Sequence, residues 1–283
     1  MTPPKSYVRN RTPQLVWEGT PPRQRVGLAL GGGAARGIAH IGVLEVLEEN
    51  NIPIDCIAGT SAGSIAGGMY AAGVTPAEMR EIVHGLSWLE VASLSLPKLG
   101  LLNFDRMIPW VEECLGDRPR TFDGLRLPFA AVAADIITGE LVAISDGRLA
   151  EALRASSSVP GIFTPMRFRN RLLVDGGVLN NLPVSVARRL GADYVIAVDL
   201  LPPGIVGGKE PSNVMDLTVT ALYMLMRATH NEGPTADQVI MPAIGHIALN
   251  DLSRADELLA AGRAAAEAVI PRLREELNLA AED

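Results

Sequence analysis

Short, wholly apolar runs alternate along the chain with longer segments in which apolar residues recur every three or four positions. The first pattern is typical of strands buried on both faces of a sheet, and the second of amphipathic helices. We therefore predict an α/β protein with three layers, in which helices cover both faces of a mainly parallel central sheet. Strands are expected at 26–30, 55–59, 128–134, 140–144, 171–174, 192–200 and near 238–241, and helices at about 36–50, 61–72, 76–84, 146–155, 184–190, 213–230 and 253–277.

Three segments do not fit this alternation. Residues 1–24 are rich in Pro and Arg, and we expect them to form an N-terminal arm beside a single domain that covers 25–283. Residues 204–208 have the composition of a flexible loop. Residues 86–118 mix large apolar side chains with Pro and Gly without a clear period. We favour irregular packing over the sheet edge for this stretch, and the alternative is a lid or a wall of an acyl-binding pocket.

Composition narrows the classes of function. The chain has 283 residues and is 48% hydrophobic but only 4% aromatic, which predicts an aliphatic core. Its net charge of −7 argues against nucleic-acid binding and against electrostatic docking on anionic lipid, so any membrane contact would be hydrophobic. The four histidines are scattered without metal-ligand spacing, which argues against a metal site. Two cysteines, no signal-peptide pattern and no apolar run of membrane-spanning length favour a cytoplasmic setting.

The stretch 55–70, DCIAGTSAGSIAGGMY, carries the first candidate chemistry. A short apolar run meets Gly59-Thr60-Ser61-Ala62-Gly63, and a helix of small residues follows. This is G-x-S-x-G between a strand and a helix, the setting of a nucleophile turn that exposes a serine hydroxyl at a helix N-terminus. The alternative is an ordinary turn in which Ser61 only caps the helix.

A glycine loop precedes this turn by about 25 residues. The strand at 26–30 runs into Gly31-Gly32-Gly33-Ala34-Ala35-Arg36-Gly37, which opens a helix. Such a loop directs unpaired backbone N–H groups at one point, and beside a serine nucleophile they would bind the oxyanion of an acyl-transfer intermediate. A dinucleotide site is the rival interpretation. It fits poorly, because Ala34 replaces the second glycine of G-x-G-x-x-G and Asp55 begins the second strand instead of ending it.

A serine needs a base to accept its proton, and Asp175 is the best candidate. It ends a predicted strand and is followed by Gly176 and Gly177. The simpler interpretation of Asp175 is a plain Asp-Gly turn. To act as the base, the carboxylate would need burial to raise its pKa. Asp135 and Asp199 also lie near strand ends, and His246, in a loop, stays open as an alternative base. The remaining histidines, His40, His84 and His230, read as packed, capping or solvated side chains.

Three segments together resemble the patatin-like phospholipase family, and its small bacterial members in particular. They are the glycine loop ending in Ala35-Arg36-Gly37, the turn Gly59-Thr60-Ser61-Ala62-Gly63, and Asp175-Gly176-Gly177, in this order and spacing. The resemblance extends over about residues 25–265. It includes 155–163, Asn180-Asn181-Leu182-Pro183 and the strand at 194–200.

The resemblance implies a patatin-like fold and a Ser–Asp dyad without histidine, with Ser61 as nucleophile and Asp175 as base. It also implies an acyl-enzyme intermediate and no cofactor. The family's oxyanion loop, G-G-G-x-[RK]-G, falls on Gly32, Gly33 and Ala34, so that its third glycine is alanine here. Since the donors are backbone N–H groups, the chemistry survives, but the methyl group is expected to affect substrate size. The supporting residues expected from the motifs are Arg36, which would fix the loop through hydrogen bonds, and Gly37, Gly59, Gly63, Gly176 and Gly177.

On these grounds we expect a serine hydrolase of the carboxylic esters of lipids, a phospholipase A, lysophospholipase or acyl esterase. Its substrate would be a lipid or fatty-acyl ester, met through transient contact with a membrane surface, and nucleic acid is not expected as a partner. Two alternatives are a carboxylesterase for small esters that never meets a membrane, and a lipid-binding regulatory module without turnover. The sequence leaves the oligomeric state open.

Overall fold

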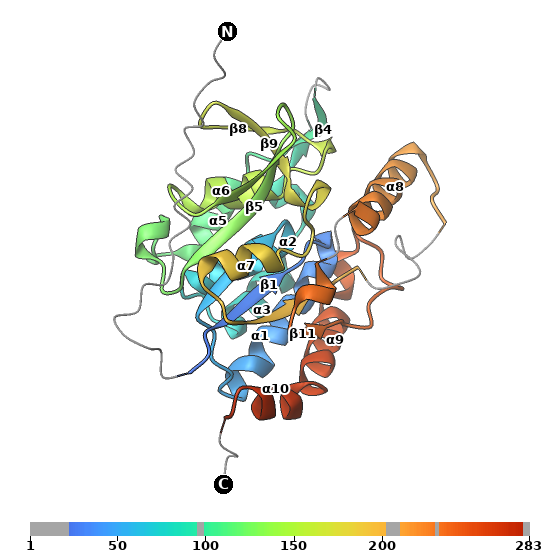
Figure 1. Cartoon of the computed structure of the whole chain (residues 1–283). Coiled ribbons are helices and arrows are strands. Elements are labelled where there is room, and N and C mark those ends of the chain that lie inside the picture. The colour runs from blue at the N-terminus through green and yellow to red at the C-terminus, as the bar shows by residue number, and fades with distance from the viewer. Residues whose placement is uncertain (1–22, 95–98, 202–209, 230–231, 280–283) are drawn as a thin grey trace.

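The computed structural model describes residues 23–94, 99–201, 210–229 and 232–279 (Figure 1). Most of the expected N-terminal arm, the expected loop at 204–208 and His230 lie outside these ranges.

The core of the molecule is a twisted sheet whose central strands are parallel. Its strand order is β11-β10-β1-β2-β5-β9-β8, with β6 paired to β5. The parallel strands are β1 (Val26–Leu30), β2 (Cys56–Thr60), β5 (Phe129–Asp135), β10 (Tyr194–Val198) and β11 (Gln238–Ile240). Each was expected from its apolar run, and the predicted fold class is confirmed.

Beyond β5 the pairing becomes antiparallel. β6 (Glu140–Ile144) and β9 (Arg171–Asp175) both pair with β5, and β8 (Met166–Phe168) pairs with β9. A second, three-stranded sheet contains β3 (Ser93–Leu94), β4 (Gly100–Asn103) and β7 (Gly161–Phe163). The strands β3, β4, β7 and β8 were not predicted, because strands of two to four residues are too short to establish a period.

Alternating side chains of the central strands divide the core into two layers. Leu28, Leu30 and Ile57 pack toward α1 (Ala39–Glu49) and α2 (Ala62–Ala71). The opposite face carries small side chains, such as Ala29 and Ala58, against which α7 (Val184–Leu190) packs. Figure 1 shows α7 in front of the sheet and α1, α2 and α3 behind it. The three-layer arrangement follows from this alternation.

The remaining helices confirm most of the predicted positions. In α3 (Pro76–Gly85) Thr75 and Glu78 form a capping box, and α6 (Leu149–Ser156) and α8 (Val214–Thr229) lie where expected. Within 86–118 the chain forms α4 (Trp88–Val91) and α5 (Met107–Leu115).

Two predicted helices are divided. The one expected at 36–50 begins as a 3₁₀ helix, η1 (Ala34–Ile38), before α1. The single helix expected at 253–277 is wrong, since η5 (Leu252–Arg254), α9 (Ala255–Glu267) and α10 (Ile270–Glu276) occupy that stretch. Pro271 lies in the first turn of α10, where its missing N–H is tolerated, whereas in the middle of a continuous helix it would remove a hydrogen bond. Short 3₁₀ helices also occur as η2 (Phe122–Gly124), η3 (Gly176–Val178) and η4 (Gly233–Thr235).

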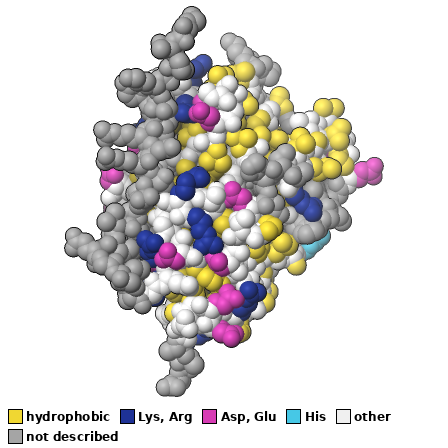
Figure 2. Space-filling view, in the orientation of Figure 1, with side chains coloured by type: hydrophobic (Ala, Val, Ile, Leu, Met, Phe, Trp, Pro, Cys, Tyr) yellow, Lys and Arg dark blue, Asp and Glu magenta, His cyan; other side chains and the backbone are white. Residues whose placement is uncertain are grey.

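Large apolar side chains are exposed in a few places on the surface. Figure 2 shows them over α8, which stands apart from the sheet at the upper right of Figure 1. In the part of the chain that the structure describes, no helix combines the length and the apolar character needed to cross a bilayer.

Candidate active site

Ser61 lies at the turn between β2 and α2 in a strained backbone conformation. Its φ is 53° and its ψ is −124°, a region that costs a non-glycine residue about 1–3 kcal/mol. It occupies the N-cap position of α2, yet its side chain makes no capping hydrogen bond. The simpler interpretation of Ser61 as a helix cap is therefore not supported, and its hydroxyl is left for another use.

The glycines of this turn allow the strand and the helix to approach closely. A Cβ at Gly63 would lie 2.1 Å from the Leu30 carbonyl oxygen, and a Cβ at Gly59 would lie 2.5 Å from the Gly63 carbonyl oxygen. Both distances are well inside van der Waals contact. The spacing G-x-S-x-G is thus a packing requirement of the turn.

A second serine supports the turn from α6. Ser156 Oγ accepts a hydrogen bond from the Ser61 backbone N–H at 3.0 Å and donates one to the Val132 carbonyl oxygen at 2.6 Å. Ser64 Oγ in turn donates to the Ser61 carbonyl oxygen at 2.7 Å. The sequence did not predict a role for Ser156. The only available signal was its place in the serine run of the segment 155–163.

Asp175 ends β9 and is completely buried. Its backbone N–H donates to the Ser158 carbonyl oxygen at 2.9 Å, and its Oδ1 accepts from the Gly177 N–H at 2.8 Å. Burial raises the pKa of Asp175 to about 6, against smaller lowering effects from the Ser61 hydroxyl and the Gly177 amide. Ser61 and Asp175 are thus brought together, although they are 114 positions apart in the sequence.

One oxygen of this carboxyl group is left over. Oδ2 has no partner at ordinary hydrogen-bond distance and angle, so the contact with the Ser61 hydroxyl is longer or less well aligned than a normal hydrogen bond. Such loose contacts are common between a nucleophile and its base before substrate binds. Oδ2 is therefore the atom free to accept a proton.

Both positions after Asp175 require glycine, because a side chain would collide with neighbouring atoms. A Cβ at Gly176 would lie 2.2 Å from the Val132 carbonyl oxygen. One at Gly177 would lie 1.8 Å from the terminal methyl of Met226 on α8 and 2.8 Å from Asn181 Oδ1. The acidic turn is thus enclosed by β5 on one side and by α8 on the other.

The glycine loop lies directly beside Ser61. A Cβ at Gly32 would be 3.1 Å from the Ser61 Cβ, and Asn181 Nδ2 donates to the Gly32 carbonyl oxygen at 3.3 Å. The Gly32 N–H is already bonded to the Asn181 carbonyl oxygen at 3.2 Å. Within the described residues, the N–H groups of Gly33 and Ala34 make no hydrogen bond. These two donors are available to an anion.

Arg36, Gly37 and His40 hold this loop from behind. Arg36 is fully buried, and its Nε and Nη2 donate to the carbonyl oxygens of Ile247 and Gly245 at 2.8 and 3.0 Å. A Cβ at Gly37 would lie 2.4 Å from the Ala62 Cβ, so the loop packs closely on the start of α2. His40 Nε2–H donates to the Gly31 carbonyl oxygen at 2.8 Å, and burial lowers the pKa of His40 to about 4, which keeps the ring neutral.

The competing bases are engaged elsewhere. Asp135 pairs with Arg171 at 3.1 Å, and Asp199 Oδ1 accepts from the Leu201 N–H at 2.9 Å. His246 Nε2 lies 2.7 Å from Glu257 Oε1, and His84 Nε2 lies 3.0 Å from Asp256 Oδ1, both on the surface. Over the described ranges, no cluster of three or more His, Cys, Asp or Glu side chains could hold a metal ion.

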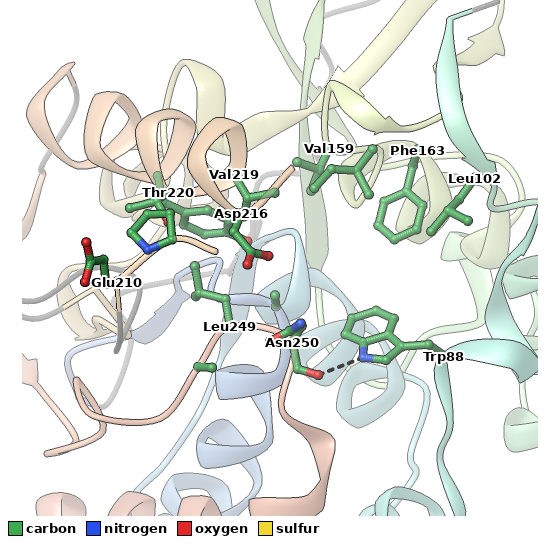
Figure 3. Close-up of a pocket in the computed structure, with 15 residues that line it drawn as sticks. Trp88, Leu102, Val159, Phe163, Glu210, Asp216, Val219, Thr220, Leu249 and Asn250 are labelled. Atoms are coloured by element: carbon green, nitrogen blue, oxygen red, sulfur yellow. Dashed lines mark hydrogen bonds between the residues drawn. The ribbon is translucent and has the colours of Figure 1, made fainter. Parts of the chain in front are cut away.

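An apolar cavity of about 310 Å³ opens beside the glycine loop (Figure 3). Figure 3 shows Val219, Asp216 and Thr220 of α8 on one side of it, and Trp88, Leu102 and Phe163 on the other. Trp88 Nε1 donates to the Asn250 carbonyl oxygen at 3.0 Å, which fixes the indole at the rim. Two residues of the segment 86–118 thus form part of the wall.

A second, smaller apolar cavity of about 100 Å³ lies on the other side of the loop. Its lining includes Ala62 and Ile65 of α2, Met79 of α3 and Trp110 of α5. Ala34 lines both cavities. Its φ of 51° is in the left-handed region, which costs an alanine about 1–2 kcal/mol and a glycine almost nothing.

The chain is similar in sequence to one known protein family and to several curated proteins. A family model described as Patatin-like phospholipase matches residues 28–188. An uncharacterized NTE family protein of Mycobacterium tuberculosis is 36% identical over 211 residues, which make up 72% of this chain and 56% of that protein. Patatin-like phospholipase domain-containing protein 6 of Mus musculus is 34% identical over 235 residues, which make up 78% of this chain and 16% of that protein. The chain spans about half the length of its mycobacterial relative.

Two solved structures share the fold. VipD from Legionella pneumophila superimposes with a TM-score of 0.61 at 13% identity, over 90% of this chain and 67% of that one. The type III effector protein ExoU gives a TM-score of 0.50 at 13% identity, over 90% of this chain and 54% of that one. At such low identity the likeness concerns the fold alone.

The burial of Asp175 predicts an unusual effect on stability. Its pKa is about 6 in the folded protein against 3.8 for an ordinary Asp, so ionisation opposes folding above pH 6 and has no effect below about pH 4, where the group is protonated in both states. We expect Asp175→Asn to raise the free energy of unfolding at pH 8 by about 1–3 kcal/mol. The gain should shrink between pH 6 and pH 4, as measured by urea denaturation at several pH values.

Asp117→Asn is the matched control, because Asp117 is exposed. This substitution should leave the free energy of unfolding nearly unchanged at every pH. A destabilised Asp175→Asn protein at pH 8 would show that the buried carboxylate is compensated by its surroundings.

Proposed function

The chain belongs to the patatin-like phospholipase family, and from that premise we propose that it is a serine hydrolase of the carboxylic esters of lipids that uses Ser61 and Asp175 as a catalytic dyad. The observation that carries this proposal is the contact between the side chains of Ser61 and Asp175. Ser61 has a strained backbone, and its side chain makes no capping hydrogen bond. Asp175 is buried, and its pKa is raised to about 6. A carboxylate with that pKa is a better base than an exposed Asp and is still mostly ionised at neutral pH.

The first half of the reaction forms an acyl-enzyme. As Ser61 Oγ attacks the acyl carbonyl carbon, its proton passes to Asp175 Oδ2, and the electron pair of the C=O bond moves to the carbonyl oxygen. The resulting oxyanion is stabilised by the free N–H groups of Gly33 and Ala34 at the start of η1. Gly32, whose N–H is occupied, forms the wall beside Ser61. When the oxyanion collapses, the ester C–O bond breaks and the leaving alkoxide takes the proton from Asp175.

The second half releases the acid. A water molecule loses a proton to Asp175 as its oxygen attacks the acyl-enzyme carbonyl, and the same two N–H groups stabilise the second oxyanion. Collapse then breaks the bond to Ser61 Oγ, which recovers its proton from Asp175. Arg36 and His40 act by holding the loop, since their side chains bind backbone carbonyl oxygens and not the substrate.

The walls of the site support an apolar acyl group. The cavity of about 310 Å³ and the smaller one of about 100 Å³ lie on the two sides of Ala34, and both are lined mainly by aliphatic and aromatic side chains. An ester with a fatty-acyl chain would remove these surfaces from water. Phospholipase A, lysophospholipase and acyl esterase activities all fit this description. In this proposal the segment 86–118 forms part of the acyl-binding wall, through Trp88 and Leu102.

Two other functions are weaker alternatives. A carboxylesterase for small esters would not need two apolar cavities. Fast hydrolysis of dispersed short-chain esters together with slow hydrolysis of phospholipid vesicles would favour this function. A lipid-binding regulatory module would not need the paired Ser61 and Asp175, and failure of a fluorophosphonate to label the purified protein would favour it. A cytoplasmic location, which the two unpaired cysteines favour, is part of the proposal.

Hydrolysis of p-nitrophenyl esters tests the proposed dyad. We expect Ser61→Ala and Asp175→Asn each to lower kcat/KM by at least about a thousandfold. The nucleophile and the base act as one unit in this proposal, so the loss of either one disables both. His246→Ala is the matched control and should retain nearly full activity, since His246 is paired with Glu257 on the surface. Activity lost in His246→Ala but kept in Asp175→Asn would identify a serine–histidine mechanism instead.

Ala34→Gly tests whether the methyl group between the two cavities limits the acyl chain. Because Ala34 lines both cavities, we expect its removal to join the two spaces. The ratio of kcat/KM for a long-chain ester to that for a short-chain ester should then rise by about threefold or more. Ala248→Gly is the control, because Ala248 lines only the larger cavity. If the ratio changed equally in both variants, the methyl group of Ala34 would not determine the preference for acyl-chain length.

A further inference from the structure

The helix α8 carries apolar side chains on its outer face as well as on the face that packs against the protein. Four large apolar side chains point outward and are more than half exposed: Val214, Leu217, Met224 and Leu225. They recur at the three- and four-residue spacing of one helical face, and Ala221 lies among them. The two charged residues of α8, Asp216 and Arg227, are on the other side of the helix, which faces the protein.

The inner face of α8 lies over the proposed active site. Asp216, Val219, Thr220 and Tyr223 line the larger cavity. Met226, one turn further, packs over the Gly177 backbone next to Asp175. Asp216 also accepts hydrogen bonds from Ser212 and Asn213 at 2.6 and 3.0 Å, so its carboxylate is used to start the helix. The carboxylate of Asp216 is therefore used at the start of the helix and in the cavity wall, on the side of α8 that faces the protein.

The opposite rim of the cavity is apolar on its outer side as well. Trp88 and Leu102 line the cavity, and their neighbours Leu89 and Leu101 are 78% and 43% exposed. Figure 3 shows α8 and the segment that carries Trp88 on opposite sides of the cavity, and Figure 2 shows apolar side chains gathered over α8. Exposed apolar groups from two separate segments thus border one apolar opening.

We propose that this rim, formed by the outer face of α8 and by Leu89 and Leu101, docks the protein on the surface of a zwitterionic phospholipid bilayer. A helix with such an apolar face lies in the plane of a bilayer with that face among the acyl chains. Because the cavity opens between the two parts of the rim, an acyl chain passes from the bilayer to the cavity without crossing water. The use of this docking in catalysis rests on the proposed function, whereas the docking itself does not.

Charge and size distinguish a bilayer from a protein partner. The net charge of −7 opposes adsorption on anionic lipid, so the binding energy must come from apolar burial, which depends little on salt. A stable protein interface takes about 20–30 residues on each side. The exposed apolar residues here are far fewer, and they surround an opening instead of forming a continuous surface. A second copy of this chain is the occupant that the test must exclude.

The experiment measures binding to large unilamellar phosphatidylcholine vesicles by cosedimentation. Ser61→Ala is the background, so that the vesicles are not hydrolysed. Leu217→Ser/Leu225→Ser should weaken partitioning by about tenfold or more, because each leucine removed from lipid loses its transfer free energy. The matched control is Ile136→Ser/Ile137→Ser, two exposed aliphatic residues in the β5–β6 turn that line neither cavity; it should bind as tightly as the background. High salt should change neither result.

Several outcomes would overturn the proposal. These are no binding of the Ser61→Ala protein, equal losses in both double variants, loss of binding at high salt, or a dimer in solution that Leu217→Ser/Leu225→Ser converts to monomer. With Ser61 intact, the Leu217→Ser/Leu225→Ser variant should hydrolyse vesicle phospholipid more slowly and soluble short-chain esters at the original rate. If the wild-type protein hydrolysed no ester while the background still bound vesicles through α8, the proposed function would fail and the docking would stand.

Discussion

The burial of an acidic group without a cation beside it is the constraint on which the candidate site depends. Asp175 is completely enclosed, and across the described chain it forms no ion pair. Its partners are the Gly177 amide and, more loosely, the Ser61 hydroxyl. An arginine at the same place would have held the pKa low and made the carboxylate a poor base. The fold thus keeps the proposed acceptor of the serine proton in a poorly solvated setting, at a cost in stability.

Several close backbone contacts maintain this arrangement. The crossing of α2 over β1 requires Gly63, and the turn after Asp175 requires Gly176 against β5. Arg36 and His40 bind backbone carbonyl oxygens, and Ser156 binds the Ser61 N–H. The side chains of these three residues position the backbone, which leaves the N–H groups at the start of η1 as free donors.

Sequence was sufficient where the signal is local. The parallel strands β1, β2, β5 and β10 are continuous apolar runs, and the glycine spacing around Ser61 reflects steric contacts within one turn. The contacts that complete the site are not local. Ser156 reaches Ser61 across 95 residues, and nothing in a run of three serines indicates which one does so. The inner face of α8 covers the Asp175 turn, but α8 is apolar on both faces, so its sequence pattern does not show which face lies inward. Pro271 did mark the break before α10, and the prediction of one helix overlooked it.

The most direct test of the Ser61–Asp175 dyad is the pH dependence of the rate at which a fluorophosphonate labels Ser61, read by mass spectrometry of the peptide that contains it. We expect one ionisation near pH 6, below which labelling slows about tenfold for each pH unit, in the wild type and equally in His246→Ala. Asp175→Asn should label very slowly at every pH. Rapid labelling of Asp175→Asn, or a pH profile that changes when His246 is replaced, would contradict a carboxylate base.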